Sequence, residues 1–281
     1  MCRWLAYRGA PIRTSEFILH PTHSIVAQSL DSPLGAEPVN GDGFGFGWYP
    51  EGTGERRPGV FHSIEPAWHD RNLRELTQVI TSPLFFCHVR AAAGPPIQQT
   101  NCHPFRHENW LFMHNGAIAE FARSKRDLVL AIDPELFLGI QGTTDSEVLF
   151  RLALTFGLRD DPVGAMRRAI GLVETTGRAH DVRFPWQGTV AVTDGATIWA
   201  FRYSTQGRSR SLFHSVDVAT LRQMYPEVER LQMFSDDAHL VVSEPTADLP
   251  GAFVEVPESS FAVLDPSGYH HEAFAPSYPG V

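Results

Sequence analysis

The order of secondary-structure patterns along the chain predicts an α+β fold in which helices cover antiparallel sheets. Strand patterns dominate the first and last thirds of the 281 residues, and two long helical patterns occupy the middle. Strands that occur in runs, instead of alternating with helices, favour antiparallel sheets over a parallel βαβ arrangement. No segment has the composition of an interdomain linker, so we expect residues 2–281 to form a single domain.

The first half of the chain contains the patterns of four strands and one helix. Residues 2–8 are expected to form a strand, and the glycine-rich residues 43–49 a second one. Apolar residues at helical spacing predict a helix within residues 67–80. Two further strands are expected at residues 84–90 and 109–115, on either side of a loop rich in Pro, Gln and Asn.

Two helices are expected in the middle of the chain. The first begins after Thr144, because Thr144 and Glu147 have the spacing of a capping box and an apolar stripe follows them. The second begins at the Asp161-Pro162 pair and ends at Gly177, since Pro is favoured at the first helical position and Gly after the last one.

The last third of the chain returns to strand patterns. Residues 188–204 predict a hairpin around Asp194-Gly195, a pair that favours tight turns. Residues 239–245 and 252–268 add further strands. Strands at both ends of the chain and helices between them complete the α+β pattern.

Composition and charge exclude several classes of protein. The net charge is −9 and no basic run exceeds two residues, which disfavours nucleic-acid binding. No apolar run approaches the ~18 residues of a membrane span. The N-terminal residues lack the apolar stretch of a signal peptide, so we expect a cytoplasmic protein. His103 and His107 are separated by Pro104, which breaks a shared helix, so we expect no metal site and no cofactor.

Cys2 directly follows the initiator methionine. Methionine is normally removed before a small residue, which would leave a thiol and a free α-amine on one residue. The amine has an ordinary pKa of about 7.7–8.0, so it can act as the base for its own thiol. The alternative is that Cys2 is a small apolar residue of the first strand.

Three other segments have chemistry that would suit such a thiol. Asn115-Gly116 is either a tight hairpin turn or an oxyanion hole, formed by the side-chain amide and a backbone N–H. Arg90, at the end of a strand, is either a solvated or ion-paired cation or a carboxylate clamp. Asp145 is either favoured by the helix dipole alone or an acceptor for an ammonium group.

Taken together, these segments resemble a known family. The N-terminal Cys is followed in order by "NGDGFGFGW", "HVR", "NCHPF", "HNG" and "TDSE". This order resembles the class II glutamine amidotransferases of the N-terminal-nucleophile hydrolase superfamily. The resemblance covers residues 2 to about 150, and the later hairpins match the second half of that fold more loosely.

The resemblance implies a four-layer αββα sandwich of two antiparallel sheets flanked by helices. It also implies that Cys2 attacks a glutamine-type side-chain amide and forms a γ-glutamyl thioester, which water hydrolyses. Asn115 and Gly116 would form the oxyanion hole. Arg90 would bind the substrate α-carboxylate, and Asp145 the α-ammonium group.

Four more residues are expected around the substrate. His88 and His114 flank the motifs as packed or orienting residues, because the terminal amine already supplies a base. Asn101 and His103 are expected to shape the pocket wall. Asp42 is expected to have an architectural role and is not one of these four.

Several segments resemble the stand-alone branch of the family, which includes the γ-glutamyl hydrolase of ergothioneine synthesis and the glutathione-degrading amidotransferase subunit. We therefore expect hydrolysis of glutamine or another γ-glutamyl amide. Alternatives are a glutaminase subunit that passes ammonia to a separate partner protein, a relative with peptide or acyl-amide specificity, and a catalytically silent module that binds an amino acid.

Overall fold

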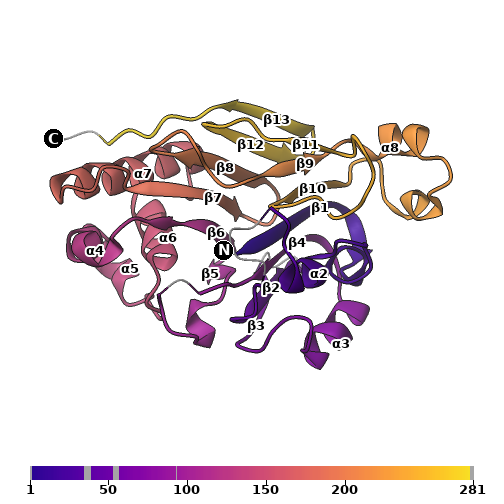
Figure 1. Cartoon of the computed structure of the whole chain (residues 1–281), viewed down its shortest axis with the longest axis horizontal. Helices are drawn as coiled ribbons and strands as arrows, with labels where there is room; N and C mark the ends of the chain where they lie inside the picture. Colours follow the sequence, from indigo (N-terminus) through magenta and orange to yellow (C-terminus); the bar gives the residue numbers. More distant parts are fainter. Residues whose placement is uncertain (1, 35–38, 53–56, 93, 279–281) are drawn as a thin grey trace.

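The computed structural model describes residues 2–34, 39–52, 57–92 and 94–278, and within them it confirms the predicted α+β class. Two antiparallel sheets are stacked in the middle of the molecule, and helices lie on their outer faces (Figure 1). This is the four-layer αββα arrangement that the resemblance implied. Strands and helices from after residue 150 contribute to it.

The first sheet has the strand order β11-β9-β10-β1-β4-β2-β3. The central strand β1 lies between β10 and β4, with Leu5 opposite both Val242 and Cys87. The strands of this first sheet are β1 (Arg3–Arg13), β2 (Phe44–Trp48), β3 (Gly59–Ser63), β4 (Thr81–Val89), β9 (Phe213–Ser215), β10 (His239–Val242) and β11 (Phe253–Glu255).

The second sheet has the strand order β13-β12-β8-β7-β6-β5. The predicted hairpin around Asp194-Gly195 is confirmed, and Thr193 pairs with Ile198 across its turn. The strands of this sheet are β5 (Phe105–His107), β6 (Trp110–Ile118), β7 (Trp186–Thr193), β8 (Ile198–Ser204), β12 (Ser260–Asp265) and β13 (Gly268–Ala273).

The helices fall into two groups on opposite sides of the sheets (Figure 1). On the side of the first sheet are α1 (Ser15–Ile18), α2 (Ile25–Leu30), α3 (Arg71–Val79) and α8 (Val218–Met224). On the side of the second sheet are α4 (Phe121–Leu130), α5 (Pro134–Phe137), α6 (Asp145–Thr155) and α7 (Pro162–Ala179). Two short 3₁₀ helices, η1 (Gln99–Asn101) and η2 (Glu229–Met233), lie in connections.

The predicted helix starts are confirmed by their caps. Thr144 Oγ1 accepts a hydrogen bond from Glu147 N at 3.2 Å, and Asp161 Oδ1 accepts one from Gly164 N at 2.8 Å. The capping box is only half formed, because the Glu147 carboxylate accepts from Gln141 N and Gly142 N instead of from Thr144 N. Glu147 therefore also orders the segment that leads into α6.

Alternation along the strands sorts the buried side chains into layers. Leu5 and Tyr7 of β1 pack under the helices of the first sheet, and Phe112 of β6 packs under those of the second. Trp4 and Ala6 lie between the two sheets, in a cluster with Leu84, Phe86, Leu111, Met113 and Ala191. The Trp4 indole Nε1 donates to Thr189 Oγ1 of the second sheet at 3.1 Å, so the start of β1 is tied to both sheets.

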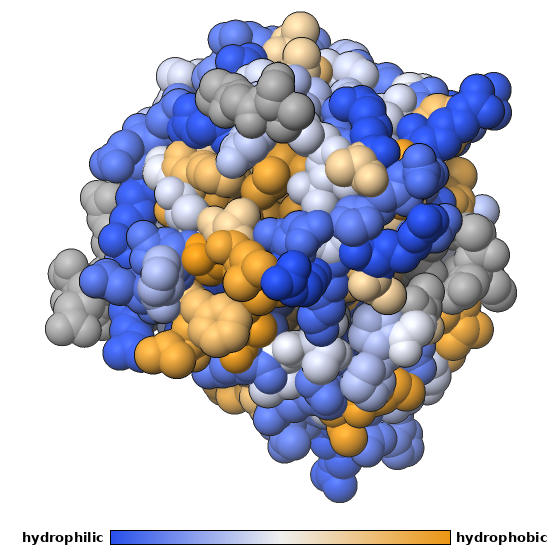
Figure 2. Space-filling model, turned by 90° about the vertical axis from the view of Figure 1, so that its left-hand side faces the viewer, coloured by the Kyte–Doolittle hydropathy of each residue, from blue (hydrophilic) through white to orange (hydrophobic). Residues whose placement is uncertain are grey.

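Figure 2 shows the face of the molecule that carries α4 and α5, where apolar side chains are grouped among polar ones. Leu130, Phe137 and Leu138 of this region are exposed, Leu138 by 86%. Within the described residues, no helix is both long enough and apolar enough to cross a membrane.

Candidate active site

Cys2 immediately precedes β1, and its side chain is directed to the same side as Trp4 and Ala6, between the two sheets. The side chain is half-buried, and its Sγ lies 3.8 Å from the carbonyl oxygen of Ala91. Burial raises the pKa of the thiol. The thiol is therefore protonated at neutral pH, and a base is required to make it a nucleophile. Met1 lies outside the described residues.

A buried ion pair holds the backbone of Cys2. The Arg3 guanidinium donates through Nε to the Glu244 carboxylate and through Nη1 to the Cys2 carbonyl at 2.7 Å. The exposed fractions of Arg3 and Glu244 are 1% and 4%. The neighbouring Ser243 pairs with Trp4, since Trp4 N donates to Ser243 Oγ at 3.1 Å and Ser243 N donates to Trp4 O at 3.0 Å.

Sequence reasoning missed this pair. The available signals were a charged residue beside Cys2 and an acidic residue at the end of the apolar segment "HLVVSEP". Neither residue indicates which residue it pairs with, because 241 positions separate Arg3 from Glu244.

Arg90 follows β4 and is directed to the space between the sheets, like His88. Its solvated or ion-paired interpretation is wrong, because only 4% of the residue is exposed and no carboxylate within the described residues pairs with it. Its guanidinium instead donates to the carbonyls of Asp42 at 3.4 Å, Pro95 at 3.2 Å and Pro96 at 3.3 Å. These contacts orient the guanidinium without neutralising it.

Asp42 supports the same corner of the site. Its Oδ2 accepts a hydrogen bond from Ala92 N at 2.7 Å, and its own N donates to Arg90 O at 3.0 Å. The Asp42 carboxylate is thus used to shape the chain that follows Arg90, in line with its expected architectural role.

The hairpin-turn interpretation of Asn115-Gly116 is wrong, because both residues lie inside β6, which continues to Ile118. The pair is opposite Thr189 and Gly188 of β7. Asn115 lies on the same side of β6 as Met113, so its amide is directed into the space between the sheets, toward the layer of Cys2. The turn signal failed because Asn-Gly also occurs where a strand needs a glycine for close packing.

The N–H of Gly116 is directed toward an unpaired edge of β6. Backbone groups alternate between the two edges of a strand, so those of His114, Gly116 and Ile118 share one edge. On that edge His88 Nε2 donates to His114 O at 3.2 Å, and Ile118 N donates to Asp145 Oδ2 at 2.8 Å. The pairing with β5 ends at Phe112, so no described strand covers the Gly116 N–H.

Only glycine fits at position 116. A Cβ added there would lie 2.1 Å from Gln187 O and 2.5 Å from Gly188 Cα. The absence of a side chain therefore keeps β6 and β7 at their close spacing, and it leaves the backbone at this edge open to a substrate.

Asp145 occupies the first position of α6 and joins that helix to β6. Besides the bond from Ile118 N, its carboxylate accepts from Ser146 N at 2.8 Å and from Ser146 Oγ at 3.2 Å. The residue is half-exposed. Its charge therefore lies beside the unpaired edge of β6, where it can also accept from an ammonium group.

His88, His103 and His114 are buried and neutral. Burial lowers the pKa of His88 to about 3 and that of His114 to about 4, and it lowers that of His103 well below its ordinary value. The rings of His88 and His103 lie 4.3 Å apart, and both ring nitrogens of His103 lack a hydrogen-bond partner within the described residues. None of these imidazoles can act as a cation near pH 7.

His114 lies on the side of β6 opposite Asn115, facing α6. Its Nδ1 and Ser146 Oγ are 2.8 Å apart, and its ring stacks on Trp186. It therefore packs behind the strand and does not line the space near Cys2.

Asn101 joins two loops. Its amide donates to Pro96 O at 2.9 Å and to Thr143 Oγ1 at 3.1 Å, and it accepts from Thr143 N at 2.8 Å. These bonds tie the segment after Arg90 to the segment before Asp145. Asn101 therefore couples the two elements that carry the charges of the site.

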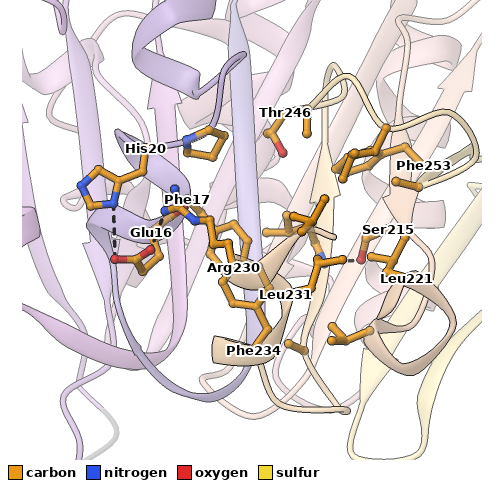
Figure 3. Close-up of a pocket in the computed structure, with 18 of the residues that line it drawn as sticks. Glu16, Phe17, His20, Ser215, Leu221, Arg230, Leu231, Phe234, Thr246 and Phe253 are labelled. Atoms are coloured by element: carbon orange, nitrogen blue, oxygen red, sulfur yellow. Dashed lines mark hydrogen bonds and ion pairs between the residues drawn. The ribbon is translucent and has the colours of Figure 1, made fainter. Parts of the chain in front are cut away.

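A separate cavity of about 300 Å³ lies between α1, α8 and β10 (Figure 3). Glu16 and His20 are at one end of it, and Leu221 and Phe253 are at the other. Three polar residues of this cavity bind each other, since Arg230 pairs with Glu16 and His20 Nδ1 lies 3.3 Å from the Glu16 carboxylate. Ser215 contributes a hydroxyl to the lining, and its Oγ accepts a hydrogen bond from Leu240 N at 3.0 Å. None of the described lining residues is a cysteine. Among the described residues, no group of three His, Cys, Asp or Glu could hold a metal ion.

The chain is similar to several known proteins. A family model described as glutamine amidotransferases class-II matches residues 22–238. The probable glutamine amidotransferase DUG3 of Saccharomyces cerevisiae is 37% identical over 292 residues, which cover 94% of this chain and 82% of the yeast protein. The gamma-glutamyl-hercynylcysteine sulfoxide hydrolase of Mycolicibacterium smegmatis is 27% identical over 201 residues, covering 70% of this chain and 81% of that hydrolase.

A solved structure resembles the whole chain. The glutamine aminotransferase class-II domain protein from Silicibacter pomeroyi superposes with a TM-score of 0.74 at 30% sequence identity. The superposition covers 98% of this chain and 100% of the other one.

Proposed function

The chain belongs to the class II glutamine amidotransferases, and from this premise we propose that it is a cysteine-nucleophile amidohydrolase. Its substrate is the side-chain amide of glutamine or of another γ-glutamyl compound. One observation carries the proposal: Cys2, Arg90 and Asn115 all face the space between the two sheets, next to the unpaired edge that holds the Gly116 N–H.

The α-amine of Cys2, freed by removal of Met1, is the proposed base. Burial keeps the thiol protonated, so a proton must leave Sγ before it attacks. The neighbouring imidazoles are poor candidates for this proton, because burial lowers the pKa of His88 to about 3. The amine is on the same residue as the thiol and has an ordinary pKa of about 7.7–8.0.

The attack of Sγ on the amide carbon produces a negative charge on the former carbonyl oxygen. Asn115 supplies a side-chain N–H and Gly116 a backbone N–H for this oxygen. The protonated amine then gives its proton to the leaving nitrogen, and a γ-glutamyl thioester remains on Cys2. Water, deprotonated by the same amine, hydrolyses the thioester and releases glutamate.

The zwitterionic head of the substrate requires one cation and one anion. Arg90 has a buried guanidinium that is oriented by carbonyls and not neutralised, so it suits the α-carboxylate. Asp145 has a half-exposed carboxylate beside β6, so it suits the α-ammonium group. The bonds of Asn101 to the loops on both sides support a fixed distance between these charges.

We propose that the products are released and not passed to an acceptor site within these residues. The helices and strands after residue 150 complete the two sheets and their outer layers, so residues 2–281 act as one catalytic unit. A separate protein that accepts ammonia is compatible with the same chemistry when glutamine is the substrate.

The test joins intact-mass analysis to turnover measurements with glutamine and γ-glutamyl amides. We expect the mature protein to lack Met1, and Cys2→Ala to lower turnover by on the order of 10³-fold or more. Cys87→Ala is the matched control, because Cys87 is buried under the helices on the opposite face of the first sheet. Undiminished turnover in Cys2→Ala would refute the proposed function.

A further inference from the structure

The connection between β8 and β9 reaches over the start of β1. On one side Gln187 Nε2 donates to the Arg208 carbonyl, and Gln187 is opposite Ala117, which follows the proposed oxyanion residues. On the other side Ser211 Oγ donates to Ser243 O at 2.8 Å. Gln187 belongs to β7, the neighbour of β6, and Ser243 follows β10, the neighbour of β1, and pairs with Trp4. The loop is therefore anchored beside the two strands that carry the proposed chemistry, and Arg210 lies between the two anchors in the sequence.

Arg210 is a cation without a partner in the part of the chain that the structure describes. Its Nε is buried and makes no hydrogen bond, and no carboxylate lies within ion-pair distance of its guanidinium. Two other arginines of the region differ, because Arg3 is bound to Glu244 and Arg202 lies 2.8 Å from the Glu255 carboxylate.

The anchors of the loop place Arg210 beside the start of β1, which Cys2 precedes. Burial, and next the charge of Arg3, lower the pKa of Arg210, while the thiolate form of Cys2 raises it. Arg210 in turn contributes to the lowered pKa of His114, after the larger effect of burial.

Glutamine has no charged group left over for Arg210 to bind. Its zwitterionic head is matched by the Arg90 cation and the Asp145 anion, and its leaving group is neutral ammonia. Arg90 and Arg210 also lie on opposite flanks of Cys2, since β1 is bordered by β4 on one side and by β10 on the other. A substrate that runs from Arg90 across Cys2 therefore continues, with its leaving group, toward the flank of Arg210.

We propose that Arg210 selects γ-glutamyl amides whose leaving amine carries a carboxylate, as the amines of amino acids and short peptides do. The guanidinium binds that carboxylate beyond the scissile bond and so favours these substrates over glutamine. This inference rests on the proposed amidohydrolase function and adds a specificity-determining residue to it.

Three substrates that differ beyond the scissile bond provide the test. γ-Glutamylglycine has a carboxylate in its leaving group, γ-glutamylglycinamide has a neutral amide at the same place, and glutamine has neither. For the wild type we expect kcat/KM to be about tenfold to a hundredfold higher for γ-glutamylglycine than for γ-glutamylglycinamide, the range of a charge-assisted hydrogen bond. Arg210→Met should bring this ratio close to one, and Arg210→Lys should restore part of it.

Arg208→Met is the matched control, because Arg208 belongs to the same loop and its side chain is exposed. It should leave the wild-type ratio unchanged. A wild-type ratio near one, with both peptides hydrolysed by Cys2, would overturn the inference and leave the proposed function intact. An equal loss for all three substrates in Arg210→Met would also overturn it, because Arg210 would then act on the nucleophile. Failure of the wild type to hydrolyse any of them refutes the proposed function and this inference together.

Discussion

Replacement of Glu244 by glutamine tests whether the buried ion pair positions Cys2, the proposed nucleophile. The Glu244 carboxylate binds Arg3, and the same guanidinium donates to the Cys2 carbonyl at 2.7 Å. Glu244→Gln keeps the size of the side chain and removes its charge. The Arg3 guanidinium then remains buried without a counter-ion. Without the Glu244 carboxylate, the orientation of the guanidinium that donates to the Cys2 carbonyl is no longer fixed.

The expected magnitude follows from the burial of both partners. Arg3 is 1% exposed and its Nη2 already lacks an acceptor, so water cannot compensate for the lost carboxylate. Removal of one partner of a buried pair costs about 3–5 kcal/mol of unfolding free energy. For a chain of this size, the melting temperature should fall by roughly 6–20 °C.

A double variant separates stability from catalysis. Arg3→Met combined with Glu244→Leu replaces the pair with apolar side chains, which recovers most of the stability because no charge remains buried. It also removes the donor to the Cys2 carbonyl. We therefore expect thermal unfolding near that of the wild type but a kcat that remains reduced.

The assays are thermal unfolding and steady-state hydrolysis of a γ-glutamyl amide. Glu255→Gln is the matched control, since Glu255 also pairs with an arginine but its side chain is 56% exposed. It should cost less than about 1 kcal/mol. Equal destabilisation by Glu244→Gln and Glu255→Gln would refute the reasoning on burial, and full activity of the double variant would refute the positioning of Cys2.

Two further outcomes are expected. Asn115→Ala should lower kcat by roughly 10²–10³-fold with a smaller change in KM, because its amide acts on charge that develops during the reaction, and a kcat within a few-fold of wild type would contradict this. The folded-state pKa values of His88 and His114 are about 3 and about 4, and both lie below the unfolded value of about 6.5. Between pH 7 and 5, these two histidines therefore become protonated only in the unfolded chain. Stability in urea should therefore fall as the pH decreases, by about 2 kcal/mol per histidine at pH 5, and His114→Gln should remove its share of that loss. A urea midpoint that stays constant between pH 7 and 5 would contradict the assignment of these histidines as neutral.

Features that depend on neighbouring residues were predicted well from the sequence. Thr144 and Asp161 were identified as helix starts, and both accept the backbone hydrogen bond of a cap. The hairpin around Asp194-Gly195 was found for the same reason, since its signal lies within a few residues. The second half of the capping box was not formed, because Glu147 found donors in the preceding loop.

Features that depend on distant residues escaped sequence reasoning. Asn115-Gly116 has the composition of a turn, but β7 pairs with it and the strand continues to Ile118. Arg90 has the composition of a surface cation, but it is buried, and its guanidinium donates to the carbonyl of Asp42, 48 positions away, as well as to those of Pro95 and Pro96. In both places tertiary contacts outweigh local preference.

The sequence by itself determined the class of the fold and the order of the chemical groups. Strand and helix periodicities and end signals are local, and the residues Cys2, Arg90, Asn115 and Asp145 could be singled out by residue type and motif order. The tertiary structure decided which of these groups share one space and what holds them there. The Arg3–Glu244 pair joins residues 241 positions apart, and the Arg210 loop comes to lie beside Trp4 through Ser243, which is 239 positions from Trp4. Such long-range pairing is set by burial and register, which no short segment contains.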